Sequence, residues 1–125
     1  MWQSIEMPGP SAGQLPLSPA TKAGGFVFVS GQGSVSEQGE IVTDSFAGEM
    51  RRSIENVARI LLVAGLDFSD VVQVRSYVRD PKDLSEYNKI YREYFKAPFP
   101  ARTTLTNCLP EFLKFEIDVV AQVRE

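Results

Sequence analysis

Residues 46–79, FAGEMRRSIENVARILLVAGLDFSDVVQVRSYVR, contain two hydrophobic periods, one after the other. In the first part, apolar residues recur every three or four positions, which predicts an amphipathic helix. These positions are Phe46, Met50, Ile54, Val57, Leu61 and Ala64. In the second part, every other residue is small or apolar, which predicts a half-buried strand. The alternating residues are Val72, Val74, Ser76 and Val78 on one side and Gln73, Arg75, Tyr77 and Arg79 on the other.

Both ends of this helix carry residues that commonly begin or end helices. Asp44 or Ser45 can accept hydrogen bonds from the first backbone N–H groups, which have no partner inside the helix. Gly65 stands where a glycine often ends a helix, because glycine adopts a left-handed backbone conformation without strain.

Shorter patterns on either side predict the remaining elements. Before the helix we expect a buried strand over 26–30, a hairpin or short strand pair over 33–42, and mostly loop over 1–25 with a weak edge strand at 2–7. After it we expect a second helix between Asp80-Pro81 and Pro98, then strands over 102–109 and 114–123. The chain is thus expected to form one α+β domain, 1–125, in which two helices cover one face of a single mixed sheet.

The other face of this sheet is half polar. In the last strand, Glu116, Asp118 and Val120 alternate with apolar residues, and Gln73, Arg75 and Tyr77 belong to the same side of the sheet. Such a face is either solvated or covered by copies of the same chain. The sequence favours neither.

Composition excludes several classes of chemistry. The 125 residues include no histidine and one cysteine, Cys108, which excludes serine–histidine catalysis, an internal disulfide and a thiolate metal cluster. We expect no metal and assign Cys108 to core packing. The net charge of -3 argues against a nucleic-acid partner. The longest apolar run, 60–66, is too short to span a membrane, and the first residues lack the pattern of a secretory signal, so we expect a cytoplasmic protein.

Arg102 and Glu116 are the first candidates for chemistry. Arg102 follows a proline-stiffened turn at the start of an expected strand, where its planar guanidinium could hold a carboxylate, or could make an ordinary surface ion pair. Glu116 could hold or deprotonate a water, or could be a solvated strand residue. If the last two strands pair antiparallel, the two side chains approach each other, across a site or as a salt bridge. Ser30-Gly31 ends a strand and offers backbone N–H groups to an anion, or is a plain turn.

The chain resembles the reactive intermediate deaminases, the Rid or YjgF family, over nearly its whole length. The likeness is strongest at Pro100-Ala101-Arg102-Thr103-Thr104-Leu105 and Phe115-Glu116-Ile117, and extends to residues 28–32, 53–57, 64–66 and 87–91. The resemblance implies a chorismate-mutase-like α+β fold assembled as a homotrimer, with ligand sites in clefts between subunits. It also implies hydrolysis of reactive enamines and imines to 2-oxo acids and ammonia, without a cofactor.

The resemblance further implies roles for individual residues. Arg102 would hold the substrate carboxylate, Glu116 would position the attacking water, and Ser30, Gly31 and Asn88 would line the site. Two further site positions, Leu17 and Thr104, depart from the family, whose members usually have tyrosine and often cysteine there.

Two other functions remain open at this stage. One is a non-catalytic module of the same fold that binds small carboxylates or a protein partner. The other is an endoribonuclease activity ascribed to some relatives, which the net charge and the absence of histidine disfavour.

Overall fold

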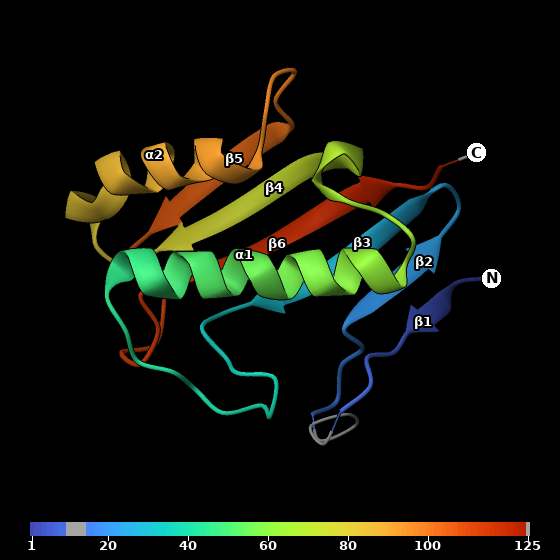
Figure 1. The fold of residues 1–125 in the computed structure, drawn as a ribbon, viewed down its shortest axis with the longest axis horizontal. Coiled ribbons are helices and arrows are strands. Elements are labelled where there is room, and N and C mark those ends of the chain that lie inside the picture. Colours follow the sequence, from blue (N-terminus) through green and yellow to red (C-terminus); the bar gives the residue numbers. More distant parts are fainter. Residues whose placement is uncertain (10–14, 125) are drawn as a thin grey trace.

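The computed structural model describes residues 1–9 and 15–124, which form one six-stranded sheet and two α-helices (Figure 1). The elements are β1 (Gln3–Ile5), β2 (Ala20–Ala23), β3 (Phe26–Gln32), α1 (Phe46–Val63), β4 (Val71–Val78), α2 (Leu84–Tyr94), β5 (Ala101–Thr106) and β6 (Phe115–Gln122), with short 3-10 turns η1 (Phe68–Asp70) before β4 and η2 (Pro81–Asp83) before α2. The strand order is β1-β2-β3-β6-β4-β5.

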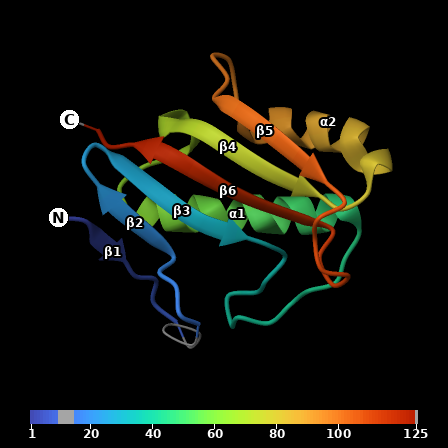
Figure 2. The same cartoon turned by 180° about the vertical axis from the view of Figure 1, so that it is seen from behind.

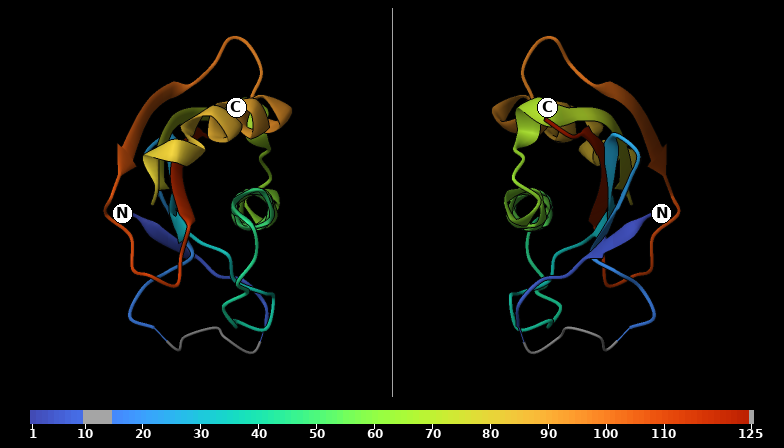
Figure 3. Two further views of the ribbon diagram at one scale, coloured as in Figure 1. Left: turned by 90° about the vertical axis from the view of Figure 1, so that its left-hand side faces the viewer. Right: turned by 90° about the vertical axis from the view of Figure 1, so that its right-hand side faces the viewer.

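Both helices lie on the same face of the sheet. Figure 2 shows the strands in front of both helices, and the side views of Figure 3 show the opposite face without a helix. Only β4 and β5 run parallel among the described strand pairs, so the sheet is mixed. The predicted fold class, a single mixed sheet with two helices on one face, is confirmed.

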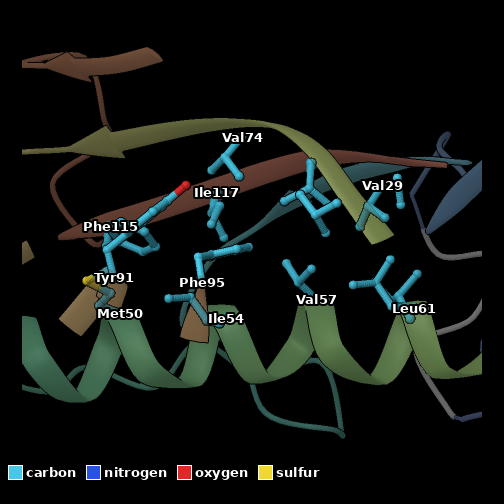
Figure 4. Packing of buried hydrophobic residues seen from close by; sticks show 14 of the residues in the cluster. Val29, Met50, Ile54, Val57, Leu61, Val74, Tyr91, Phe95, Phe115 and Ile117 are labelled. Atoms are coloured by element: carbon cyan, nitrogen blue, oxygen red, sulfur yellow. The ribbon is translucent and has the colours of Figure 1, made fainter. Parts of the chain in front are cut away.

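Helix α1 begins and ends where its sequence predicts. The Ser45 side chain accepts a hydrogen bond from the backbone N–H of Gly48, and Gly65 follows the helix with a φ of 77°. Figure 4 shows Ile54, Val57 and Leu61 pointing from the helix toward the sheet. All three are fully buried, because the apolar stripe of α1 faces the strands.

The strand after this helix departs from strict alternation at its first residues. Val71 pairs with Ala121, but Gln73 pairs with Val120, so β4 carries one extra residue at this point. The bulge turns Val72 outward, to 40% exposure, and buries Val71 in its place. The predicted core position of Val72 is therefore wrong, whereas Val74, Ser76 and Val78 are buried as expected.

The N-terminal part of the chain contains more strand than its sequence predicts. The expected edge strand is confirmed as β1, but residues 20–23 form β2, which was expected to be loop. This strand has only four residues and shows no clear alternation, so its structure depends on pairing with β1 and β3. The expected hairpin at 33–42 is reduced to one bridge between Val35 and Ile41.

The last two strands do not pair with each other. Strand β4 lies between β5 and β6, so the antiparallel pairing considered above does not occur. β5 ends at Thr106 and is followed by Asn107, whose φ of 61° is incompatible with a continuing strand. The predicted strand over 102–109 is too long at this end, and Cys108 is exposed instead of buried in the core.

Candidate active site

Arg102 lies on the side of the sheet that the helices cover. It pairs in register with Val74, which is fully buried beneath the helices, so both side chains leave the sheet on that face. Its guanidinium carbon lies 5.0 Å from the ring centre of Tyr87 and 4.8 Å from that of Tyr91, both on α2. A guanidinium at this distance from two aromatic rings is held in place by cation–π attraction.

Asn88, a third residue of α2, also contacts the Arg102 guanidinium. Its Nη1 donates a hydrogen bond of 2.9 Å to Asn88 Oδ1, which uses one of the five N–H donors of the guanidinium. No carboxylate in the described part of the chain pairs with Arg102, so the surface ion pair is not what the structure contains. The remaining donors are available to a ligand.

An open pocket lies beside this arginine. Its volume is about 230 Å³, and its lining consists of Asn88, Tyr91, Arg92, Phe99, Pro100 and Arg102. Two cations and two aromatic side chains suit a small anion with an apolar part. The pocket is smaller than the roughly 300 Å³ at which drug-sized ligand sites begin, which fits a compact molecule.

Thr104 follows Arg102 by two residues on β5, so its side chain lies on the same face of the sheet. Its Oγ1 shares a hydrogen bond of 2.9 Å with the hydroxyl of Tyr87. The same tyrosine ring supports the Arg102 guanidinium, so Thr104 restrains the arginine through Tyr87. This hydrogen bond depends on the helix packing and is not visible from sequence spacing.

Glu116 lies on the opposite, helix-free face. It stands between Phe115 and Ile117, which are both fully buried under the helices, and alternation directs its own side chain the other way. Burial, and after it the negative charge of Asp118, raise the pKa of the Glu116 carboxyl above its ordinary value. A carboxylate whose pKa is raised is a better proton acceptor at neutral pH than an ordinary one.

Gly31 provides the space that Glu116 occupies. A Cβ atom at this position would lie 3.0 Å from Glu116 Oε2 and 3.2 Å from its carboxyl carbon. The pairing of β3 with β6 shifts by one residue between Val29 and Gln32, which brings the Gly31 backbone close to the carboxylate. Ser30 and Gly31 also line a second recess of about 140 Å³ together with Arg75 and Asp118.

Ser30 binds the chain segment that precedes β2 through two hydrogen bonds. Its hydroxyl donates a 2.6 Å hydrogen bond to the carbonyl of Ser18, and its backbone N–H donates to the carbonyl of Pro19. Leu17 comes directly before this anchored segment and is 58% exposed. The structure therefore links the Ser30 position to Leu17, while Leu17 itself contributes an exposed apolar side chain.

Arg75, Tyr77 and Asp118 form a hydrogen-bonded cluster on the helix-free face. From the sequence, these residues were expected only to belong to a half-polar face of the sheet. Arg75 Nε donates to Asp118 Oδ1 at 2.9 Å, and the Tyr77 hydroxyl donates to Asp118 Oδ2 at 2.8 Å. The alternation in residues 72–79 and 115–123 places these three side chains on one face. Their mutual contacts required the register of β4 against β6.

The two candidate catalytic residues do not meet within one chain. Arg102 lies under α2 on the covered face, whereas Glu116 lies on the helix-free face, and β4 separates their strands. Two half-sites result: the arginine pocket, whose lining includes Asn88, and the Glu116 carboxylate beside Gly31, a residue that lines the second recess together with Ser30. A site that uses both residues needs two copies of the chain.

Comparison with known proteins identifies the family. The family described as Endoribonuclease L-PSP matches residues 10–123. The chain belongs to this family, the Rid or YjgF family. This Rid-family chain is 37% identical to a RutC family protein of Pyrococcus horikoshii over 108 residues, which cover 85% of this chain and 86% of the relative.

Other relatives of this Rid-family chain carry functional names. A human protein named 2-iminobutanoate/2-iminopropanoate deaminase is 35% identical over 108 residues, 85% of this chain and 79% of the relative.

The crystal structure of a Rid-family protein of unknown function from Yersinia pestis is also similar. It has a TM-score of 0.89 at 29% identity and covers 98% of this chain and all of that one. The fold of this chain is therefore the Rid fold.

The described residues contain neither a membrane-spanning helix nor a cluster of metal-binding side chains. Neither helix in residues 1–9 and 15–124 combines the length and apolar content needed to cross a bilayer. The same residues contain no group of three or more histidine, cysteine, aspartate or glutamate side chains arranged to hold a metal ion.

Proposed function

We propose that this Rid-family chain hydrolyses small 2-imino acids and their enamine tautomers to 2-oxo acids and ammonia. The observation that carries the proposal is the setting of Arg102, a cation held over two tyrosines at an open pocket with most of its donors free. The name of the human relative, an imine deaminase, supports the same reaction.

Arg102 binds the carboxylate of the substrate in this proposal. Its planar donors match the two oxygens of a carboxylate, and Asn88 together with the two tyrosines keeps the guanidinium in one orientation. Holding the acid end fixes the position of the imine carbon, which lowers the entropic part of the barrier.

Glu116 positions and activates water. The carboxylate takes a proton from water as the oxygen adds to the carbon of the protonated imine, and the product of this addition is a neutral carbinolamine. The carboxylate returns this proton to the nitrogen. The hydroxyl proton then passes to the carboxylate as the carbonyl forms and the carbon–nitrogen bond breaks, and the departing ammonia takes up that proton as ammonium. The raised pKa of Glu116 suits both the acceptance and the return of this proton.

The proposed site lies between copies of the chain, as the separation of Arg102 and Glu116 on opposite faces requires. The helix-free face offers an apolar contact surface, since Phe26, Phe28 and Leu105 are each more than 40% exposed. We propose a homotrimer in which the arginine pocket of one subunit meets the Glu116 carboxylate and the neighbouring Gly31 of the next. Leu17, exposed near the Ser30 anchor, and Thr104, behind Arg102, then influence which imine fits.

The test is imine hydrolysis in a coupled assay. An amino-acid oxidase generates 2-imino acids from a panel of amino acids, and semicarbazide traps the imine that survives. The wild-type protein should lower the trapped product, Arg102→Ala should not, and Arg51→Ala should match the wild type because Arg51 pairs with Glu93 on the exposed surface of the helices.

The alternative functions give different results. Binding of 2-oxo acids through Arg102 without any loss of trapped imine across the panel indicates the binding module. Cleavage of RNA by the wild type, unaffected by Arg102→Ala, indicates an endoribonuclease. Either result contradicts the deaminase proposal.

A further inference from the structure

Tyr77 and Arg75, two side-chain donors of β4 on the face of Glu116, donate to Asp118 instead of to Glu116. Tyr77 lies directly opposite Glu116 in the register of β4 and β6, yet its hydroxyl donates to Asp118, at 2.8 Å. Arg75, opposite Asp118, also donates to Asp118, at 2.9 Å. In residues 1–9 and 15–124, no side chain donates a hydrogen bond to the Glu116 carboxylate, although it is half-buried.

Asp118 is the better satisfied of the two carboxylates. Both of its oxygens accept a hydrogen bond, and only 15% of its side chain is exposed, against 58% for Arg75. The two hydrogen bonds thus hold the Asp118 side chain in place two residues from Glu116, on the same face of the same strand.

Few other charged groups face Glu116 in the described residues. Strand β3 supplies none, since Phe26–Gln32 has no titratable side chain. From the β4 side, Arg79 follows Tyr77 on this face and donates to the backbone carbonyl of Glu111. Lys114 turns to the other side of the sheet, where it pairs with Glu49. Asp118 and Arg75 therefore dominate the local field.

We propose that Asp118, held by Tyr77 and Arg75, is a positioning group that keeps Glu116 unpaired and sets the strength with which it accepts a proton. The proposal rests on the role of Glu116 in the proposed imine hydrolysis. Tyr77 and Arg75 would otherwise be free to donate to Glu116, and a carboxylate that accepts such hydrogen bonds is a weaker base. By drawing both donors, Asp118 leaves the Glu116 oxygens free for water.

Opposite charge changes in this cluster should move the pH dependence in opposite directions. Asp118→Asn removes the negative charge and frees Arg75 to attract Glu116, so the acidic limb of the pH–rate profile should move to lower pH. Arg75→Gln leaves the Asp118 charge uncompensated, so the limb should move to higher pH. At a pH one unit below the wild-type midpoint, we expect the relative rate to rise about two- to threefold in Asp118→Asn and to fall about as much in Arg75→Gln.

A structural role alone gives a different result. Loss of packing lowers the plateau rate or the melting temperature of both variants without moving the limb, or moves it in the same direction. Either outcome overturns the proposal. Arg124→Gln is the matched control, because Arg124 pairs with Asp67 and Asp70 and not with Glu116 or Asp118. The acidic limb of this variant should coincide with that of the wild type.

A titration separates this inference from the proposed reaction. Carbon-13 NMR of the glutamate-labelled protein follows the Glu116 carboxyl in the wild type and in both variants, with Glu116→Gln to assign the signal. A lower midpoint in Asp118→Asn and a higher one in Arg75→Gln support the positioning role even if the protein hydrolyses no imine. Unchanged midpoints overturn it even if the protein is an active deaminase.

Discussion

At the scale of single residues, the spacing that matters is between Gly31 and Glu116. The glycine has no side chain, and the carboxylate fills the space that a Cβ atom would need. Since the neighbouring atoms are the end of a flexible side chain, an added methyl group displaces the carboxylate and leaves the backbone in place. The lack of a side chain at Gly31 therefore determines where the Glu116 carboxylate can lie and has little effect on the stability of β3.

Gly31→Ala should therefore impair activity far more than stability. We expect imine hydrolysis to fall by about tenfold or more, because small displacements of a catalytic group are costly, and the melting temperature to change little. Gly25→Ala is the control, since nothing lies within 4 Å of its added Cβ. Equal activities of the two variants in the coupled assay would contradict this account.

Glu116 itself should destabilise the folded chain at neutral pH. Burial raises its pKa, so the folded state binds a proton more readily than the unfolded state. Its contribution to stability is fully present below the ordinary pKa of 4.5 and is lost as the pH rises through the raised value. Glu116→Gln should thus melt at a higher temperature than the wild type at pH 7, and the difference should vanish near pH 4. Calorimetry at both pH values checks this, and a stabilisation that persists at pH 4 speaks against it.

At the scale of elements, a buried carboxylate connects α1 to the start of β6. Glu49 is fully buried in the first turn of α1 and accepts hydrogen bonds from the backbone N–H of Lys114 at 3.0 Å and of Asp44 at 3.1 Å. Lys114 Nζ lies 3.2 Å from the same carboxylate. These contacts join segments more than sixty residues apart, and β6 carries Glu116 two positions further on.

Glu49→Ala should lower the free energy of unfolding by about 3 kcal/mol, because it removes the carboxylate that Lys114 pairs with and leaves two backbone N–H groups without their acceptor. Chemical denaturation followed by circular dichroism measures the change. Glu93→Ala removes the exposed ion pair with Arg51 and should leave the transition midpoint unchanged. Similar midpoints for the two variants would mean that the buried pair does not stabilise this junction.

Local sequence patterns predicted helices and strands well where one hydrophobic period continues over many residues. The stripe from Phe46 to Leu61 predicted α1 because a helix of five turns repeats the same signal several times. The bulge at Val72 escaped prediction, since one inserted residue reverses the alternation and depends on the partner strand. β2 escaped because four residues are too few for a period and its structure comes from pairing.

At the scale of the whole molecule, the question is how two half-sites on opposite faces combine. A homotrimer should scatter light as a particle of three times the 13.9 kDa chain mass. Mixing gives a sharper test. When inactive Arg102→Ala and Glu116→Gln chains exchange subunits, some interfaces join an intact Arg102 to an intact Glu116, and hydrolysis should return to a fraction of the wild-type rate. Continued inactivity after confirmed exchange would show that the two residues do not share a site between chains.

The sequence by itself determined the family, the α+β class, the limits of α1 and the identity of Arg102 and Glu116 as candidates. These follow from residue types and short periods, which are local properties of the chain. Only the tertiary structure decided which faces the two residues occupy. It also decided that Arg75 and Tyr77 donate their hydrogen bonds to Asp118 and not to Glu116. The reason is physical: the insertion of β4 between β5 and β6, and the registers that result, arise from contacts between distant segments and leave no mark in local spacing.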